Sequence, residues 1–104
     1  MRRIDKQTVL DAYNTCGLKP IQGITKLDDS CCLIGALILA KSPEQSEFML
    51  NDTAKSLGYT ASYVAGLVDG FDGEARTRLF VDKSEYAVGI QDGQMAWEAV
   101  RDAV

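Results

Sequence analysis

The sequence contains no histidine, and this absence removes several kinds of site. A cysteine nucleophile would have no histidine base beside it, and zinc sites that combine cysteine with histidine are excluded. The chain has three cysteines, Cys16, Cys31 and Cys32, and their spacing fits neither a disulfide framework nor a zinc site. We therefore expect three buried, reduced thiols that pack as small hydrophobic side chains.

Long apolar runs are also missing. The one extended run, residues 31–40, has about half of the ~20 residues that a helix needs to cross a bilayer. The first residues, Met-Arg-Arg-Ile-Asp, are not followed by the apolar stretch of a signal peptide. From these two absences we expect a cytoplasmic protein that has no membrane partner.

Positive charge is scarce, because 11 lysines and arginines face 15 aspartates and glutamates, for a net charge of -4. Neutralisation of phosphates by basic side chains supplies most non-specific affinity for nucleic acids, so this balance disfavours a nucleic-acid partner. No glycine-rich loop suitable for phosphate is present, since residues 70–73 are too few and too acidic, and we expect no cofactor. The remaining composition is that of an ordinary globular protein.

Capping residues predict where the first two helices begin and end. Asp5 is a suitable N-cap for the first helix, and Gly17 stands where a left-handed residue would end it. The second helix is predicted at about residues 30–40 and has no polar face, so we expect it to lie buried at the centre of the core. Acidic and hydroxyl side chains at residues 28–30 are expected to cap it.

Three further helices are predicted in the second half of the chain. Ser42 is the expected N-cap of the third helix, and Gly58 ends it. The fourth begins near residues 60–62 and stops at the Asp-Gly-rich turn of residues 69–73. Asp82, followed by glutamate three residues later, starts a fifth helix that runs to the C-terminus.

The predicted fold is therefore all-α, a compact bundle of about five helices that forms a single domain over residues 1–104. The links between the helices leave room for one very short two-stranded pairing, between residues 21–25 and residues 74–81. Glycine at position 23 makes the first of these two strands the weaker prediction.

One motif occurs twice in the chain. Residues 63–70 read Tyr-Val-Ala-Gly-Leu-Val-Asp-Gly, and residues 86–93 read Tyr-Ala-Val-Gly-Ile-Gln-Asp-Gly. In each copy the two glycines are four residues apart and therefore share one helix face. Glycine within a helix costs about 1 kcal/mol relative to alanine, so matched glycines in both copies indicate a compensating contact.

We expect the two glycine faces to pack closely against each other, so that the fourth and fifth helices cross as a pseudo-symmetric pair. The same faces could instead dock against a second subunit of a homodimer. The residues predicted to form this packing or interaction motif are Tyr63, Gly66, Asp69, Gly70, Phe71, Asp72, Tyr86, Gly89, Asp92, Gly93 and Trp97.

The aspartates of the motif suggest a second interpretation, a shared cation site formed by Asp69 and Asp92 together with Asp72 and Glu74. The segment does not match an EF-hand loop, which needs ligands at alternating positions and a glycine at its sixth position. A basic cluster, Arg76, Arg78 and Lys83, precedes the fifth helix. Such a cluster is typical of a solvated rim, and an anion site is the alternative.

A third interpretation is a helix-turn-helix regulator, because residues 50–70 resemble the DNA-binding motif of bacterial repressors. Ala54 falls in the first helix, Gly58 in the turn and Val64 in the second helix. A recognition helix normally offers basic or amide side chains to the DNA. Residues 56–74 contain no lysine, arginine, asparagine or glutamine, which argues against this interpretation.

Taken together, four segments resemble a family of small bacterial and phage-associated all-α proteins with no assigned function. They are Thr-Cys-Gly-Leu-Lys-Pro at residues 15–20, Cys-Cys-Leu-Ile-Gly-Ala-Leu at 31–37, Gly-Phe-Asp-Gly at 70–73 and Ala-Trp-Glu-Ala at 96–99. The resemblance implies no activity, cofactor or site residue.

The sequence therefore favours a non-enzymatic interaction or scaffold domain that acts as a homodimer. The alternatives are the helix-turn-helix regulator and a small-ligand or cation binder at the Asp-Gly motifs. No catalytic residue is predicted, because no pair of carboxylates stands out from the acidic surface as a candidate for acid–base chemistry.

Overall fold

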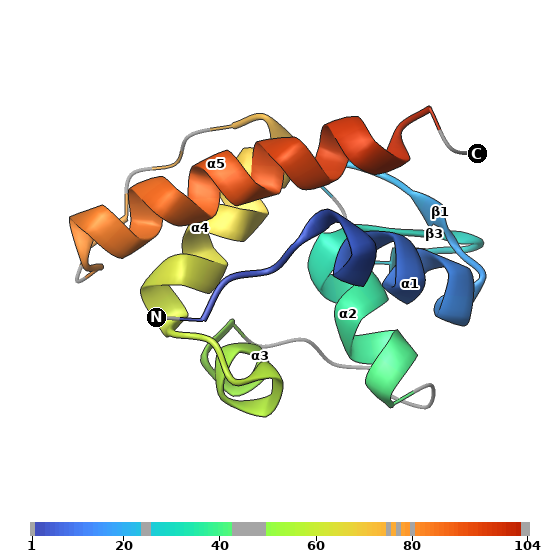
Figure 1. Cartoon of the computed structure of the whole chain (residues 1–104), viewed down its shortest axis with the longest axis horizontal. Helices are drawn as coiled ribbons and strands as arrows, with labels where there is room; N and C mark the ends of the chain where they lie inside the picture. The colour runs from blue at the N-terminus through green and yellow to red at the C-terminus, as the bar shows by residue number, and fades with distance from the viewer. Residues whose placement is uncertain are drawn as a thin grey trace.

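The computed structural model describes residues 2–23, 26–42, 50–74, 76, 78–79 and 81–102, with the backbone alone at residues 26–27 and 50–53. The all-α prediction is confirmed, because helices dominate the described residues and the strands are only two residues long (Figure 1). The helices are α1 (Lys6–Cys16), α2 (Leu33–Lys41), α3 (Leu50–Leu57), α4 (Ala61–Asp72) and α5 (Lys83–Val100).

Helix α1 begins and ends where its capping residues predict. The Asp5 side chain accepts a hydrogen bond from the Thr8 N–H at 2.8 Å, which satisfies a backbone donor in the first turn. Gly17 has φ of 70° and donates its N–H to the Tyr13 carbonyl, so it closes the helix in the left-handed conformation. Both predicted boundaries are confirmed.

Helix α2 is the apolar centre of the core, as predicted. Every residue from Leu33 to Leu39 is buried. Its predicted cap was wrong, because the N-cap is Cys32, whose side chain makes no capping hydrogen bond. Residues 28–30 instead belong to a tight turn and a strand, with Asp28 at a positive φ of 50°. All three cysteines are reduced; Cys31 and Cys32 are buried, and Cys16 is half-buried.

A small sheet lies between α1 and α2 in the sequence. Strands β1 (Lys19–Pro20), β2 (Lys26–Leu27) and β3 (Ser30–Cys31) are arranged in the order β1-β3-β2. Strand β3 pairs in parallel with β1 and in antiparallel with β2. The pairing considered between residues 21–25 and residues 74–81 is not found: no described residue of either segment is in a strand. The observed partners are close in sequence, so the loops that bring them together are short.

Capping residues also mark the end of α3, both ends of α4 and the start of α5. Residues 43–49, which include the predicted start of the third helix, lie outside the described residues; Gly58, with φ of 79°, follows the end of α3. Thr60 accepts from the Tyr63 N–H and begins α4, and Gly73 ends it. The Asp82 side chain accepts hydrogen bonds from two backbone N–H groups and caps the start of α5. This helix ends at Val100, a few residues short of the predicted end at the C-terminus.

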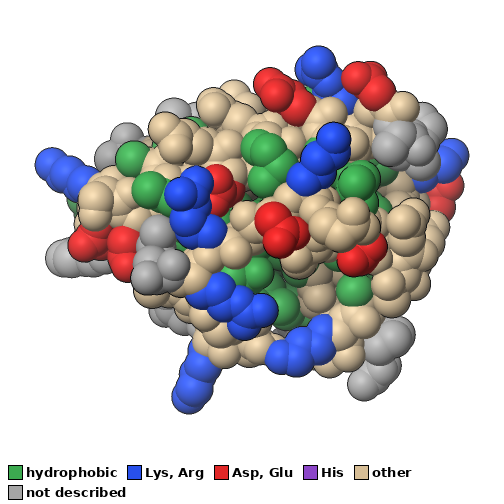
Figure 2. Space-filling view, in the orientation of Figure 1, with side chains coloured by type: hydrophobic (Ala, Val, Ile, Leu, Met, Phe, Trp, Pro, Cys, Tyr) green, Lys and Arg blue, Asp and Glu red, His purple; other side chains and the backbone are tan. Residues whose placement is uncertain are grey.

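Among the described helices and strands, α4 and α5 form the most extensive contact. They lie side by side and run in the same general direction, and the segment between them returns along the outside of the pair (Figure 1). Helices α1 and α2 pack against each other beside this pair, and α3 contacts α4. Figure 2 shows side chains of both charge signs spread over one face of the molecule, with a hollow in its lower part.

Candidate functional site

The glycines of the repeated motif lie where the backbones of α4 and α5 touch. A Cβ atom added to Gly66 would stand 2.2 Å from the Tyr86 carbonyl oxygen, and one added to Gly89 would stand 2.3 Å from the Tyr63 carbonyl oxygen. Both distances are far below any ordinary carbon–oxygen contact, so neither position has room for even an alanine.

The second glycine of each copy makes the same kind of contact. A Cβ on Gly70 would meet the Ile90 carbonyl oxygen at 2.2 Å, and one on Gly93 would meet the Leu67 carbonyl oxygen at 2.4 Å. Adding 23 to the number of the α4 residue and subtracting 23 from that of the α5 residue converts each contact into its counterpart, so Gly66–Tyr86 corresponds to Gly89–Tyr63. The two helices are therefore related by a pseudo-two-fold axis, and their glycine faces lie against each other within one chain.

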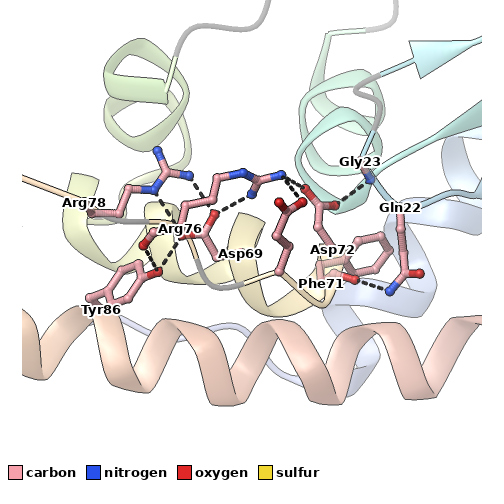
Figure 3. Close-up of polar contacts among 9 residues, drawn as sticks. Gln22, Gly23, Asp69, Phe71, Asp72, Arg76, Arg78 and Tyr86 are labelled. Carbon is pink, nitrogen blue, oxygen red and sulfur yellow. Dashed lines mark hydrogen bonds and ion pairs between the residues drawn. The ribbon is translucent and has the colours of Figure 1, made fainter.

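A cluster of polar side chains surrounds Asp69, which is fully buried (Figure 3). Arg78 donates to both carboxylate oxygens, at 3.0 and 2.7 Å, and Arg76 donates to one of them at 2.5 Å. The Tyr86 hydroxyl of the other motif copy donates to Asp69 at 2.5 Å. We call Asp69, Arg76, Arg78 and Tyr86 the Asp69 cluster.

The charges of the Asp69 cluster are balanced inside the cluster. Burial by itself would raise the pKa of Asp69, but hydrogen bonds from Arg78, Tyr86 and Arg76 outweigh it and hold that pKa below its ordinary value. The carboxylate raises the pKa of both arginines, and burial followed by the hydrogen bond to Asp69 raises the pKa of Tyr86. Asp69 therefore stays ionised at neutral pH and is a poor general base.

The second copy of the motif builds an equivalent cluster around Asp92. The Tyr63 hydroxyl donates to Asp92 at 2.5 Å, and Arg3 donates to both carboxylate oxygens, at 3.0 and 2.8 Å. The same tyrosine oxygen accepts the Ile4 N–H at 2.8 Å. We call Asp92, Tyr63 and Arg3 the Asp92 cluster; it joins the N-terminal segment to α5.

The Asp92 cluster follows the same electrostatic logic with less burial of its cation. Burial by itself would raise the pKa of Asp92, but hydrogen bonds from Arg3 and Tyr63 outweigh burial and hold that pKa below its ordinary value. Burial, followed by the hydrogen bond to Asp92, raises the pKa of Tyr63 well above its ordinary value. The Arg3 side chain is 53% exposed, so only the acidic half of this ion pair is shielded from water.

The other residues of the predicted motif are structural in their contacts. Phe71 is fully buried; it stacks on Tyr13 with ring centroids 6.5 Å apart and meets Trp97 edge-on at 5.3 Å. Asp72 accepts from the Gly23 N–H at 2.9 Å and from Arg76 at 3.2 Å. These contacts tie the end of α4 to α1, α5 and the segment that follows β1.

The predicted cation site does not assemble from these residues. Asp69 and Asp92 belong to separate clusters that share no residue, and arginine already occupies both oxygens of each. In the part of the chain that the structure describes, no group of three cysteine, aspartate or glutamate side chains is placed to hold a metal ion. Lys83 lies exposed in the first turn of α5 and is not part of the Asp69 cluster.

The segment predicted as a helix-turn-helix consists of two helices joined at Gly58, but the second is unsuited to enter a DNA groove. Most of α4 is buried, including Tyr63, Val64 and Leu67, which have no exposed surface. A recognition helix must present one long face to the major groove. The glycine face of α4 is covered by α5, and its other buried residues belong to the core.

Sequence reasoning missed the exchange of tyrosines between the motif copies and the role of Arg3. The exchange had a signal, because tyrosine precedes aspartate by six residues in both copies, and a two-fold axis brings each tyrosine to the other copy's aspartate. Arg3 had none: it lies 89 residues from Asp92 in the sequence.

Comparison of the chain with known protein families, with curated proteins and with solved structures gave no match. The resemblance to small bacterial and phage-associated proteins therefore stays a prediction. Over the described residues, every helix is too short or too polar to span a bilayer. What the structure supplies is two arginine-neutralised aspartates on a tightly packed helix pair.

Proposed function

We propose that this chain is a non-enzymatic interaction domain that acts in the cytoplasm as a homodimer. The residues with the strongest potential for chemistry, Asp69 and Asp92, are held ionised by arginines and tyrosines of the same chain. Groups neutralised in this way stabilise a fold and have little capacity to move protons. The proposal therefore assigns the chain a contact surface in place of a reaction centre.

The observation that carries the proposal is the placement of Leu79. Its side chain is 74% exposed, and among the described residues no other large hydrophobic side chain is classed as exposed. Arg78, the residue directly before Leu79, binds Asp69 of α4, and Arg76 binds the same carboxylate, so the position next to Leu79 is anchored to α4. A leucine held outward on an anchored segment binds a partner at a small cost in chain ordering.

The contact that we propose is between Leu79 and its symmetry mate in a second copy. A two-fold dimer uses the same patch on both subunits, so one exposed leucine supplies both halves of the apolar centre. The glycine faces do not take part in this dimer, because they already pack against each other inside the chain.

Sedimentation velocity tests this proposal. The wild-type chain should sediment as two copies at micromolar concentration, and Leu79→Lys should sediment as one, because the lysine places two like charges at the two-fold axis. Ala87→Lys is the matched control, since Ala87 is an exposed residue of α5, and it should leave the dimer intact. A wild-type monomer at high micromolar concentration would contradict the proposal.

Sequence-specific DNA binding has less support. The buried α4 and the absence of basic and amide residues from positions 56–74 leave the segment without a reading surface. A salt-sensitive shift of duplex DNA by the purified chain would restore that interpretation.

A further inference from the structure

A hollow of about 570 Å³ opens between α1, the end of α2 and the last turn of α3. In Figure 2 it lies in the lower part of the face shown, with basic side chains at its edges and hydrophobic atoms inside. We call it the basic cleft. Its volume is within the range of natural ligand sites, and its residues belong to neither the Asp69 cluster nor the Asp92 cluster.

The floor of the basic cleft is apolar. Leu37 and Ala12 are buried there, and Ala40, Leu57 and Tyr59 are half-buried. These side chains come from α1, α2, the end of α3 and the turn after it, so the floor is a junction between elements that pack on one core. A medium-sized apolar side chain would remove this surface from water.

The edge of the basic cleft carries an excess of positive charge. Arg2, Lys41 and Lys55 line it together with one acid, Asp11, and all four are exposed. Among the described lining residues the charge is therefore +2 (three cations and one anion), whereas the whole chain has a net charge of -4. A local field opposite in sign to that of the protein selects acidic partners.

Two of these cations are held in place by the end of α3. Arg2 donates to the Leu57 carbonyl at 3.2 Å and stands over the Tyr59 ring, 5.2 Å from its centroid. Lys41 donates to the Ser56 carbonyl at 2.5 Å. These bonds offset the negative C-terminal end of α3. A guanidinium has five N–H donors and an ammonium three, so each cation keeps donors for a ligand.

Lys55 differs from the other two cations. It lies in the last turn of α3, and it forms no ion pair with any described residue. It therefore adds charge to the edge of the basic cleft, and no ion pair with another described side chain depends on it. This makes Lys55 the residue at which charge can be changed with least risk to the fold.

We propose that the basic cleft binds an acidic segment of a partner protein, with one apolar side chain on the floor and flanking carboxylates against Arg2, Lys41 and Lys55. The proposal rests on the function as an interaction domain and names the kind of partner. Carboxylates suit the edge because charge-assisted hydrogen bonds are the strong ones. The apolar floor requires that the segment also carry a hydrophobic residue.

The probe for this proposal is a fluorescein-labelled peptide, Gly-Glu-Glu-Leu-Glu-Glu-Gly, followed by fluorescence polarisation at low salt. The wild-type chain should bind it, and binding should weaken as salt is added, because exposed charges are screened. Peptides in which glutamine replaces every glutamate, or alanine replaces the leucine, should each bind more weakly.

Lys55→Glu should weaken binding by about tenfold, equivalent to ~1.4 kcal/mol. Lys83→Glu is the matched control: it makes the same charge change on α5, away from the basic cleft, and should bind like the wild type. Thermal melting should show that both variants are folded. The proposal is overturned if the glutamate peptide does not bind, if the glutamine peptide binds equally well, or if the two variants weaken binding equally.

The same variants separate this inference from the homodimer. Lys55→Glu should still sediment as two copies, because Leu79 is untouched, and Leu79→Lys should still bind the peptide. If binding fails and the dimer remains, the acidic partner is wrong and the interaction domain stands. If the protein is a monomer that binds the peptide through Lys55, the homodimer is wrong and the cleft stands.

Discussion

The Asp69 and Asp92 clusters share the same core, an aspartate bound by arginine and by the tyrosine of the other motif copy. They differ in where their arginines lie in the sequence. Asp69 takes Arg76 and Arg78 from the segment directly after its own helix. Asp92 takes Arg3 from the opposite end of the chain. The first cluster closes a short loop, and the second joins the N-terminal segment to the last helix.

This difference also appears in the burial of the cations. The side chains of Arg76 and Arg78 are 34% and 25% exposed, whereas that of Arg3 is 53% exposed. Screening by water weakens an ion pair, so the Asp69 cluster should hold its helix end more firmly. The same repeated residues therefore support two contacts of unequal strength, and the three predictions below test that inequality.

The largest effect is expected at the glycines that both clusters depend on. Gly66→Ala and Gly89→Ala should each destabilise the fold by about 3 kcal/mol or more, because the added Cβ meets backbone that cannot move aside. Helix propensity alone predicts that the same changes stabilise the fold by about 1 kcal/mol. The sign of the change in the free energy of unfolding therefore distinguishes a close helix crossing from an ordinary helix position. The measurement is urea denaturation.

Gln94→Ala is the control for the glycine variants, because Gln94 is exposed on α5 beside Gly93. It should leave the free energy of unfolding within about 0.5 kcal/mol of the wild type. Equal destabilisation by Gly66→Ala and Gly89→Ala would support the pseudo-two-fold axis. A stabilised glycine variant would show that the helices do not cross closely.

A smaller effect is expected when the two aspartates are neutralised. Asp69→Asn should cost about 2 kcal/mol, below the range for a fully buried ion pair that loses one partner, because two arginines lose their counter-charge but remain 34% and 25% exposed to water. Asp92→Asn should cost less, since Arg3 can turn to water. Chemical denaturation of the two variants side by side measures the difference, and a larger loss for Asp92→Asn would reverse the ranking of the clusters.

The smallest effect is expected from acid, and it distinguishes the clusters by pKa. The pKa of each aspartate is lower in the folded chain, so each adds stability above the unfolded value of about 3.9 and loses it as the pH falls through its folded pKa. In Arg3→Gln the pKa of Asp92 should rise while that of Asp69 stays low. Carboxyl NMR titration can follow both; a shift of both aspartates together would indicate that the clusters are coupled.

The ends of most helices could be predicted from the sequence, because a cap is a local interaction. Asp5, Thr60 and Asp82 each bond to backbone groups two or three residues away. The buried α2 was equally predictable, since a helix without a polar face has to avoid water on every side. The wrong prediction of a helix cap at residues 28–30 has the same origin. Aspartate and serine favour turns as well as caps, and here they form a turn and the start of β3.

The candidate site was predictable only in part. The repeat of tyrosine, glycine and aspartate identifies residues that matter, and the clash of an added Cβ gives the reason for the glycines. The basic cleft could not be found, because Arg2, Lys41 and Lys55 are far apart in the sequence and meet only after α1, α2 and α3 pack. The spacing of residues along the chain does not indicate which exposed lysines and arginines will line the same cleft.

The sequence by itself determined the all-α class, most caps, the buried second helix and the presence of a matched pair of glycine helices. These follow from local backbone preferences and from the spacing of apolar residues. Only the tertiary structure decided that the glycine faces meet within one chain and that each tyrosine serves the other copy's aspartate. It also decided that arginines from the N-terminal segment and from the segment after α4 neutralise the two aspartates. Those contacts depend on distances across the fold, which residue spacing along the chain does not contain.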